Sequence, residues 1–147
     1  MEKIKIYLDN CCFNRSFDDQ TQLKIKLETD AKIFIQNKML SGEYDFVWSY
    51  ILEFENNRNP YFDKRKTIAE WKHLATAHCV ANEQIIAYAE SLHKLGIKAK
   101  DALHISCAVY TECDCFITTD KKILNTPLED ILTINPVSFI TELEEFL

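Results

Sequence analysis

Acidic side chains stand directly after predicted strands, or at the start of a predicted helix, at several places in the sequence. The candidates are Asp9, Glu53, Glu55, Asp101 and Asp120. In an open parallel sheet, ligands bind outside the carboxyl ends of the strands. We therefore expect these carboxylates to meet at one edge of a sheet.

Neighbouring carboxylates repel each other and resist ionising together. A divalent cation removes that conflict, and a set of oxygen ligands favours Mg²⁺ or Mn²⁺. Two such ions about 4 Å apart can activate a water and stabilise the leaving oxygen of a phosphodiester. The same ions screen a substrate phosphate from the negative charge of the protein. The acids therefore indicate metal-dependent phosphodiester chemistry.

Each acid also has an ordinary structural explanation. Asp101 suits the first turn of a helix, where a carboxylate caps free N–H groups and faces the positive end of the helix dipole. Asp120 stands before two lysines and suits a turn or a cap, and Asp9 suits the polar end of a strand. Glu53 and Glu55 could be solvated helix positions. The metal hypothesis therefore depends on the joint placement of the acids rather than on any one of them.

Short apolar segments alternate with helical patterns along the whole chain of 147 residues. Strands are expected at 4–8, 44–49, 79–80, 115–118 and 131–134. Helices are expected at 22–40, 51–57, 63–78, 82–96, 99–110 and from 136 onward. The helix over 22–40 is predicted to be amphipathic, with its apolar stripe at Leu23, Leu27, Ala31, Phe34 and Ile35. The alternation predicts a single domain over residues 1–147, with a three-layer α/β/α fold and a parallel sheet of four to five strands.

Composition narrows the functional classes. The formal net charge of −6 argues against a simple electrostatic nucleic-acid binder, but not against an enzyme that holds cations. Two glycines are too few for a nucleotide-binding glycine motif. No apolar run approaches the ~20 residues of a membrane span, and the N-terminus has no signal-peptide core. The six cysteines lack paired Cys-x-x-Cys spacing, so we expect reduced thiols in the cytoplasm rather than zinc ligands.

Three segments together resemble signature segments of the PIN domain family, in order and in position. They are Tyr7-Leu8-Asp9-Asn10, Lys100-Asp101-Ala102-Leu103-His104-Ile105 and Phe116-Ile117-Thr118-Thr119-Asp120-Lys121-Lys122. The stretch 14–20 resembles a subgroup of stand-alone prokaryotic PIN proteins. The resemblance covers nearly the whole chain. It implies a small α/β/α protein, and many members are Mg²⁺- or Mn²⁺-dependent ribonucleases, including the VapC-type toxins of toxin–antitoxin pairs.

The resemblance also implies roles for particular residues. Asp9, Asp101 and Asp120 match the acids of the family, and Thr118 matches a hydroxyl neighbour that orients a carboxylate. A fourth acid is expected after the second strand. We prefer Glu55, because it shares the helix face of the apolar residues three and four positions earlier, and we keep Glu53 as the second choice.

Other positions receive weaker assignments. Asn10 replaces the small hydroxyl residue that often follows the first aspartate, and it is expected to support the site by hydrogen bonding. Arg15, Lys100, His104 and Lys121 are candidates for contact with substrate phosphate, although a packed histidine is the more common role for His104.

The resemblance implies an RNA substrate, an antitoxin partner and a homodimer. Two different functions stay open. The chain could be a catalytically degenerate binding module with the same fold, or a metal-dependent phosphohydrolase acting on DNA or a small phosphoester.

Overall fold

The computed structural model describes residues 3–14 and 21–143, and within them five parallel strands form one sheet. The strands are β1 (Lys5–Leu8), β2 (Asp45–Ser49), β3 (Ala77–Cys79), β4 (Cys115–Ile117) and β5 (Leu132–Ile134). Their order across the sheet is β3-β2-β1-β4-β5, and every neighbouring pair is parallel. The predicted α/β class and strand number are confirmed.

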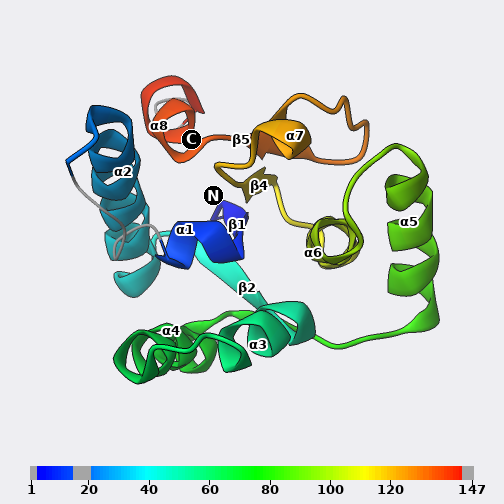
Figure 1. Ribbon diagram of the computed structural model, residues 1–147, viewed down its shortest axis with the longest axis horizontal. Helices are drawn as coiled ribbons and strands as arrows, with labels where there is room; N and C mark the ends of the chain where they lie inside the picture. The colour runs from blue at the N-terminus through cyan, green and yellow to red at the C-terminus, as the bar shows by residue number, and fades with distance from the viewer. Residues whose placement is uncertain (1–2, 15–20, 144–147) are drawn as a thin grey trace.

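Helices cover both faces of this sheet. They are α1 (Asn10–Asn14), α2 (Leu23–Leu40), α3 (Tyr50–Asn57), α4 (Phe62–Leu74), α5 (Glu83–Lys94), α6 (Ala99–Tyr110), α7 (Lys121–Leu124) and α8 (Pro136–Ser138), with a π-helix at Phe139–Leu143. Figure 1 shows α5 and α6 on one side of the strands and α2 with α8 on the other. The arrangement is the expected three-layer one. None of the helices in the described part of the chain is long and apolar enough to cross a membrane.

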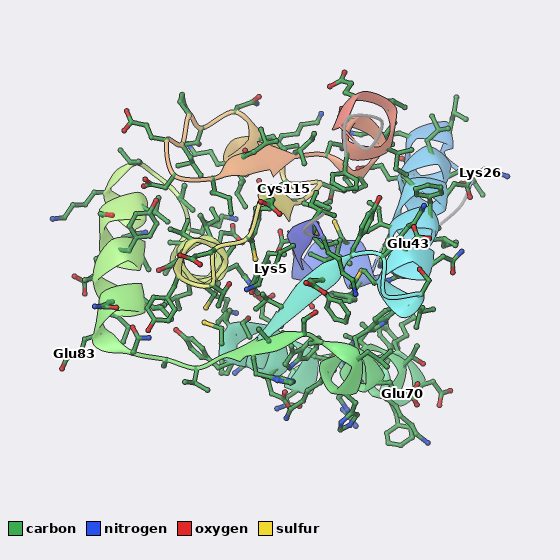
Figure 2. The ribbon with its side chains drawn as sticks, turned by 180° about the vertical axis from the view of Figure 1, so that it is seen from behind. Lys5, Lys26, Glu43, Glu70, Glu83 and Cys115 are labelled. Carbon is green, nitrogen blue, oxygen red and sulfur yellow. The ribbon has the colours of Figure 1, made fainter. Side chains whose placement is uncertain are left out.

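β1 lies at the centre of the sheet, between β2 and β4, and the direction of the strand order reverses there. The carboxyl ends of these three strands are therefore neighbours. The chain moves from β1 outward to β2 and β3, and later returns to the other side of β1 with β4 and β5. Such a reversal opens a crevice at the carboxyl edge of the sheet, where ligands bind in open α/β folds. The opposite edge is seen in Figure 2, with the first residues of β1 and β4, Lys5 and Cys115, near the centre of the view.

The central strand is buried on both faces, as expected for a parallel sheet under two helical layers. Ile6, Tyr7 and Leu8 have almost no exposed surface. The Tyr7 ring stacks on Phe116 of β4, with 5.2 Å between ring centroids. A tyrosine at such a position must find a hydrogen-bond partner for its hydroxyl inside the protein. That requirement shapes the candidate site.

Helix α2 begins and ends as predicted, but its buried face differs from the prediction. Leu23, Leu27 and Phe34 are exposed, while Glu28 and Lys32 are buried. The predicted Ala31 and Ile35 are buried, but the inward face also includes positions 28, 32 and 39. Asn135 donates to the Glu28 carboxylate (3.4 Å), and the Lys32 ammonium lies 5.9 Å from the centroid of the Phe13 ring.

Two further boundaries differ from the prediction. Helix α4 ends at Leu74 rather than near His78, because residues 77–79 pair with β2 as a strand. Its N-cap is Tyr61, so Asp63 lies in the first turn instead of capping the helix. The short helix α1 was not predicted. Residues 15–20 of the polar stretch that follows it lie outside the described residues.

Candidate functional site

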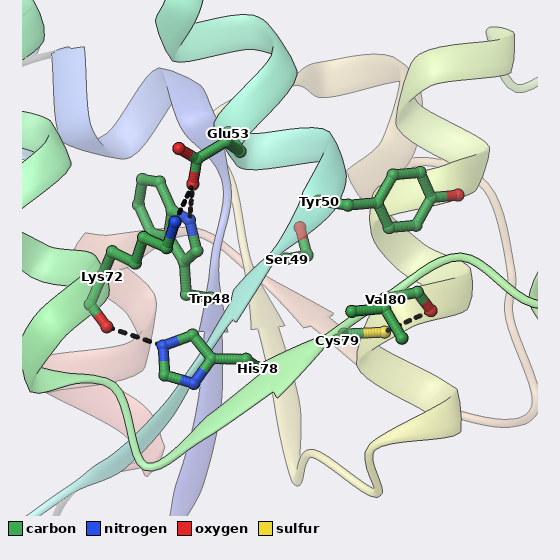
Figure 3. Close-up of a pocket in the computed structure, with 8 residues that line it drawn as sticks. All are labelled: Trp48, Ser49, Tyr50, Glu53, Lys72, His78, Cys79 and Val80. Carbon is green, nitrogen blue, oxygen red and sulfur yellow. Dashed lines mark hydrogen bonds and ion pairs between the residues drawn. The ribbon is translucent and has the colours of Figure 1, made fainter.

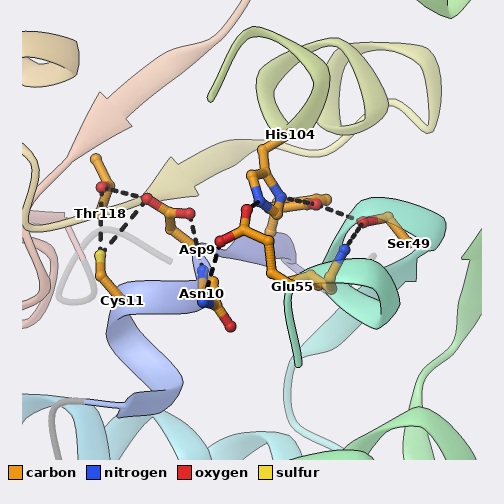
Figure 4. A network of polar contacts seen from close by, with 9 residues as sticks. Asp9, Asn10, Cys11, Ser49, Glu55, His104 and Thr118 are labelled. Atoms are coloured by element: carbon orange, nitrogen blue, oxygen red, sulfur yellow. Dashed lines mark hydrogen bonds and ion pairs between the residues drawn. The ribbon is translucent and has the colours of Figure 1, made fainter. Parts of the chain in front are cut away.

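Asp9 follows β1 directly and is the most buried acid of the candidate set, with 5% of its surface exposed. Its backbone N–H extends the ladder between β1 and β4 by donating to the Ile117 carbonyl (2.9 Å). Both carboxylate oxygens accept hydrogen bonds: Oδ1 from the Asn10 backbone N–H (2.8 Å) and Oδ2 from the Thr118 hydroxyl (2.7 Å). Cys11 Sγ lies 3.5 Å from Oδ2 (Figure 4). The carboxylate is therefore held in one orientation.

Glu55, on α3, lies across from Asp9 and is connected to it through Asn10. The Asn10 side-chain amide donates to Glu55 Oε2 (3.2 Å), and His104 Nε2 is paired with Oε1. Burial acts to raise the pKa of the Glu55 carboxyl. The hydrogen bond and charge of His104, together with the charge of Lys100, outweigh burial and lower that pKa below its ordinary value. Glu55 is thus kept ionised.

A buried chain of hydrogen bonds, which begins at His104, holds Glu55 in position. His104 Nδ1 bonds the Tyr7 hydroxyl (2.6 Å), and the same hydroxyl bonds Ser49 Oγ (2.6 Å). Ser49 also caps α3 by accepting from the Leu52 backbone N–H (3.2 Å). Sequence reasoning missed Tyr7 and Ser49 as part of the site. The available signal was a tyrosine in the middle of a strand predicted to be buried.

The burial of His104 agrees with the packed role that was the more common expectation and argues against the alternative of a phosphate contact. The ring has no exposed surface, and both nitrogens are engaged, by Tyr7 and by Glu55. The histidine is therefore a positioning residue for Glu55 and does not face a substrate.

Asp120 is joined to Asp9 through Thr118. The Thr118 hydroxyl that donates to Asp9 also accepts from the Asp120 backbone N–H (3.1 Å). The Asp120 carboxylate caps α7, where Oδ1 accepts from the backbone N–H groups of Lys122 (2.8 Å) and Ile123 (3.3 Å). The cap explains part of its presence, as its ordinary structural interpretation predicted.

Asp101 lies in the first turn of α6, and its charged form is disfavoured by burial and by the neighbouring acids. Burial, followed by the negative charges of Asp9 and Asp120, raises the pKa of its carboxyl to about 6. Glu55 adds to the rise, and His104 opposes it. The four acids Asp9, Glu55, Asp101 and Asp120 therefore act on one another, and they have more negative charge than their surroundings compensate.

Comparison with known proteins supports the fold. No protein-family model matches the sequence, and no curated protein matches it. Among solved structures, the chain matches one from the crystal structure of VapBC2 from Rickettsia felis bound to a DNA fragment from their promoter. The match has a TM-score of 0.58 and 12% identity, and it covers 90% of this chain and 98% of the other. The fold is PIN-like. At this identity, the likeness concerns the fold alone.

Within the PIN-like fold, the second-choice acid Glu53 lies in different surroundings from Glu55. Its Oε2 accepts from the Trp48 indole N–H (2.8 Å) and pairs with Lys72 Nζ (3.2 Å). Burial opposes them, but these contacts lower the pKa of Glu53 below its ordinary value. Glu53 and Lys72 line a cavity of about 300 Å³ beside the ends of β2 and β3 (Figure 3). In this cavity the glutamate already has its counter-ion.

Three candidates for contact with substrate phosphate remain. Lys100 is exposed, and its charge reaches Glu55. Lys121 is exposed at the start of α7. Arg15 lies outside the described residues. None of the six cysteines, all of which are described, forms a disulfide.

The donor set fits a hard divalent cation in its chemistry, because the acids offer only carboxylate oxygens and have an excess of negative charge. Within residues 3–14 and 21–143, no group of three or more His, Cys, Asp or Glu side chains stands close enough to form a ready ligand shell. The carboxylates are neighbours joined through Asn10 and Thr118. Asp9, Glu55, Asp101 and Asp120 are the residues that would hold an ion here.

Proposed function

We propose that this protein is a divalent-metal-dependent endoribonuclease that hydrolyses RNA phosphodiesters. Its metal ligands would be Asp9, Glu55, Asp101 and Asp120, with Mg²⁺ or Mn²⁺ as the ion. One observation carries the proposal: four acids from four separate segments interact at the carboxyl edge of the central strands, and Asp101 has a raised pKa because the surplus charge is not compensated.

Each residue of the chain has a distinct task in this proposal. Asp9 is held by Thr118 and Asn10, so its carboxylate needs little reorganisation to take a ligand. His104 keeps Glu55 ionised and oriented, and Asp101 would gain from a cation because burial and its acidic neighbours disfavour its charged form. A bound Mg²⁺ or Mn²⁺ would lower the pKa of a water and stabilise negative charge on phosphate oxygens.

The PIN-like fold and the resemblance of three sequence segments to PIN ribonucleases support the same function. One solved structure with this fold is that of VapBC2 bound to a DNA fragment from their promoter. By that analogy, the proposal extends to a role as the toxin of a toxin–antitoxin pair, with an antitoxin partner, a homodimer and a cytoplasmic location. These extensions rest on the fold and on the resemblance, and the chemistry proposed above does not depend on them.

The direct test is cleavage of a mixed RNA pool by the purified protein. We expect cleavage with Mn²⁺, none with EDTA, and none with the variant Asp9→Asn, which keeps the shape of the side chain and removes its charge. Losing one ligand is expected to cost several kcal/mol of transition-state stabilisation, on the order of 1,000-fold in rate. Unchanged cleavage by folded Asp9→Asn would overturn the assignment.

A degenerate binding module is the second candidate, and it is favoured by the lack of a ready ligand shell among the described residues. Calorimetric titration with Mn²⁺ separates the two. The proposed nuclease should bind Mn²⁺ and lose that binding in Asp9→Asn, whereas a degenerate site should give no heat. A parallel assay on DNA of the same sequence tests whether the substrate is RNA.

A further inference from the structure

Three aromatic side chains are exposed, one on α3 and two at the start of α4. Phe54 is 45% exposed, Tyr61 63% and Phe62 64%. Rings this exposed contribute little to the core, and grouped exposed apolar side chains usually mark a binding site. We name these three residues the aromatic surface.

Every ring of the aromatic surface has a cation beside it. Lys64 Nζ lies 4.6 Å from the centroid of Tyr61, and Arg65 Cζ lies 5.5 Å from that of Phe62. Phe54 has two cations, with Arg58 Cζ at 5.4 Å and Lys100 Nζ at 5.6 Å. The protein as a whole has a net charge of −6, so this grouping of positive charge runs against its composition. The partner that fits it is anionic and has flat apolar groups.

The backbone that presents the aromatic surface is held by internal hydrogen bonds. The Asn56 side-chain amide donates to the Arg65 carbonyl (2.9 Å), and Arg65 Nη1 donates to the Asn59 carbonyl (3.1 Å). Asn59 Oδ1 accepts from the Tyr61 backbone N–H (3.1 Å). The corner between α3 and α4 is therefore set before any ligand arrives, which lowers the entropy cost of binding.

The aromatic surface begins beside the carboxylates. Phe54 directly precedes Glu55 on α3, and Lys100, whose ammonium lies over the Phe54 ring, directly precedes Asp101 on α6. A strand of nucleotides lying on the surface would thus have one end next to the acids. The other two rings, Tyr61 and Phe62, follow along the chain at the start of α4.

We propose that the aromatic surface binds single-stranded RNA, with bases stacked on Phe54, Tyr61 and Phe62 and phosphates paired with Arg58 and Lys100. This inference rests on the proposed nuclease function and names the form of its substrate. Unpaired bases stack on exposed aromatic rings whatever their sequence, whereas the bases of a duplex are already stacked on each other. Cation–π contacts at exposed sites are weak, so a phosphate can take over the cation.

Binding of a fluorescent single-stranded 12-nucleotide RNA in EDTA tests this proposal, because cleavage does not contribute in EDTA. Stacking on one ring changes affinity by roughly 5- to 100-fold, so Phe54→Ala and Phe62→Ala should each weaken binding within that range. Phe54→Tyr restores a ring at this position and should recover most of the affinity that Phe54→Ala loses. Arg58→Gln should weaken binding and lower the dependence of log affinity on log salt by about 0.7.

Matched controls come from exposed residues on other parts of the molecule. Tyr110→Ala removes an exposed ring at the far end of α6, about 15 Å along that helix from Lys100, and Lys94→Gln removes a charge at the end of α5. Both should bind RNA like the wild type. The same RNA annealed to its complement should bind more weakly than the single strand.

Three results would overturn the proposal: no RNA binding by the wild type, equal binding by Phe54→Ala and Phe62→Ala, or equal affinity for duplex RNA. The first would point to a protein partner for the surface. The outcome is separate from that of the nuclease test. If RNA binding depends on Phe54 but no RNA is cleaved with Mn²⁺, the aromatic surface stands and the proposed catalysis fails. If RNA is cleaved but the ring variants bind it unchanged, the catalysis stands and the aromatic surface fails.

Discussion

Glu53 and Glu55 lie two residues apart on α3, yet they belong to two electrostatically different regions. Glu53 pairs with Lys72 and the Trp48 indole beside the ends of β2 and β3, so its charge is compensated locally. Glu55 meets Asn10 and His104 in a group that also includes Asp101, whose pKa is raised by burial and by its acidic neighbours. The first region contains a complete ion pair between Glu53 and Lys72. The second keeps an excess of negative charge, which the proposed cation would compensate.

The fold explains why such similar positions have such different surroundings. One turn of an α-helix has 3.6 residues, so positions two apart face opposite sides. One side of α3 faces the end of β3 and α4, and the other faces α1 and α6. The carboxyl edge of β1 therefore receives Glu55, and the cavity beside β3 receives Glu53.

Within this comparison, the largest effect on cleavage is expected from Glu55→Gln, with Glu53→Gln as its control. Glu55→Gln removes a charge from the proposed ligand set and should reduce Mn²⁺-dependent RNA cleavage by on the order of 100-fold or more, because ligand loss costs several kcal/mol. Glu53→Gln is the matched control, with the same chemical change on the same helix, and its rate should stay within about threefold of the wild type. Initial cleavage rates at fixed Mn²⁺ compare them. Equal losses in both variants would remove the distinction between the two regions.

A smaller effect is expected from the buried support of Glu55. Tyr7→Phe keeps the ring on Phe116 but leaves His104 Nδ1 and Ser49 Oγ without the hydroxyl that joins them. Loss of this support should weaken Mn²⁺ binding about 10-fold, as for other residues that orient metal ligands. It should also lower the free energy of unfolding by about 1–3 kcal/mol, because buried polar groups lose a partner.

Tyr88→Phe provides the comparison for that prediction. The Tyr88 hydroxyl donates to Asp130 (2.7 Å) at an exposed position, where water can replace the lost bond. Its unfolding free energy should change by less than about 1 kcal/mol and its Mn²⁺ affinity not at all. Calorimetric titration measures the affinity, and urea denaturation measures stability. A Tyr7→Phe protein that is less stable but binds Mn²⁺ normally would reduce Tyr7 to a core residue.

The sequence predicted the positions of the candidate carboxylates better than it predicted the residues that orient them. Asp9, Asp101 and Asp120 stand at strand ends or a helix start, and such positions follow from the alternation of apolar and polar residues. The His104–Tyr7–Ser49 chain joins a helix, a strand and a cap that are far apart in sequence, so no local pattern contains it. The burial of His104 likewise depends on how α6 packs on the sheet, which periodicity alone does not specify.

The buried face of α2 shows the same limit in the fold. Counting apolar residues selected Ala31 and Ile35 correctly, but it also selected three exposed residues, Leu23, Leu27 and Phe34. The helix instead buries Glu28 and Lys32, which lie beside groups from other parts of the chain. A polar residue at a buried position is acceptable once it is satisfied, and satisfaction depends on tertiary contacts. The longer helices and the five strands were predicted because their signals are local, as for Asn82, which caps α5 through the Ile85 backbone N–H (2.9 Å).

The smallest effects are changes in stability, and here the two regions should differ in sign. Without metal at pH 7, Asp101→Asn should stabilise the protein, because it removes a charge whose ionised form burial and its acidic neighbours disfavour. A rise in pKa from 3.8 to about 6 corresponds to roughly 3 kcal/mol, and solvent screening of this half-buried group reduces the expected gain to about 1–2 kcal/mol. Glu53→Gln should instead destabilise by up to about 1 kcal/mol, since it breaks the pair with Lys72.

The dependence on pH makes this contrast sharper. The folded pKa of Asp101 is raised, so its cost is absent below pH 4, grows as pH rises toward 6, and is complete at pH 7. The advantage of Asp101→Asn over the wild type should follow that course. The folded pKa of Glu53 is lowered, so its contribution is present at pH 7 and is lost as pH falls through that value. Urea denaturation in EDTA between about pH 3 and 7.5 measures both. An Asp101→Asn protein less stable than the wild type at pH 7 would mean that the acids around Asp9 are not in conflict.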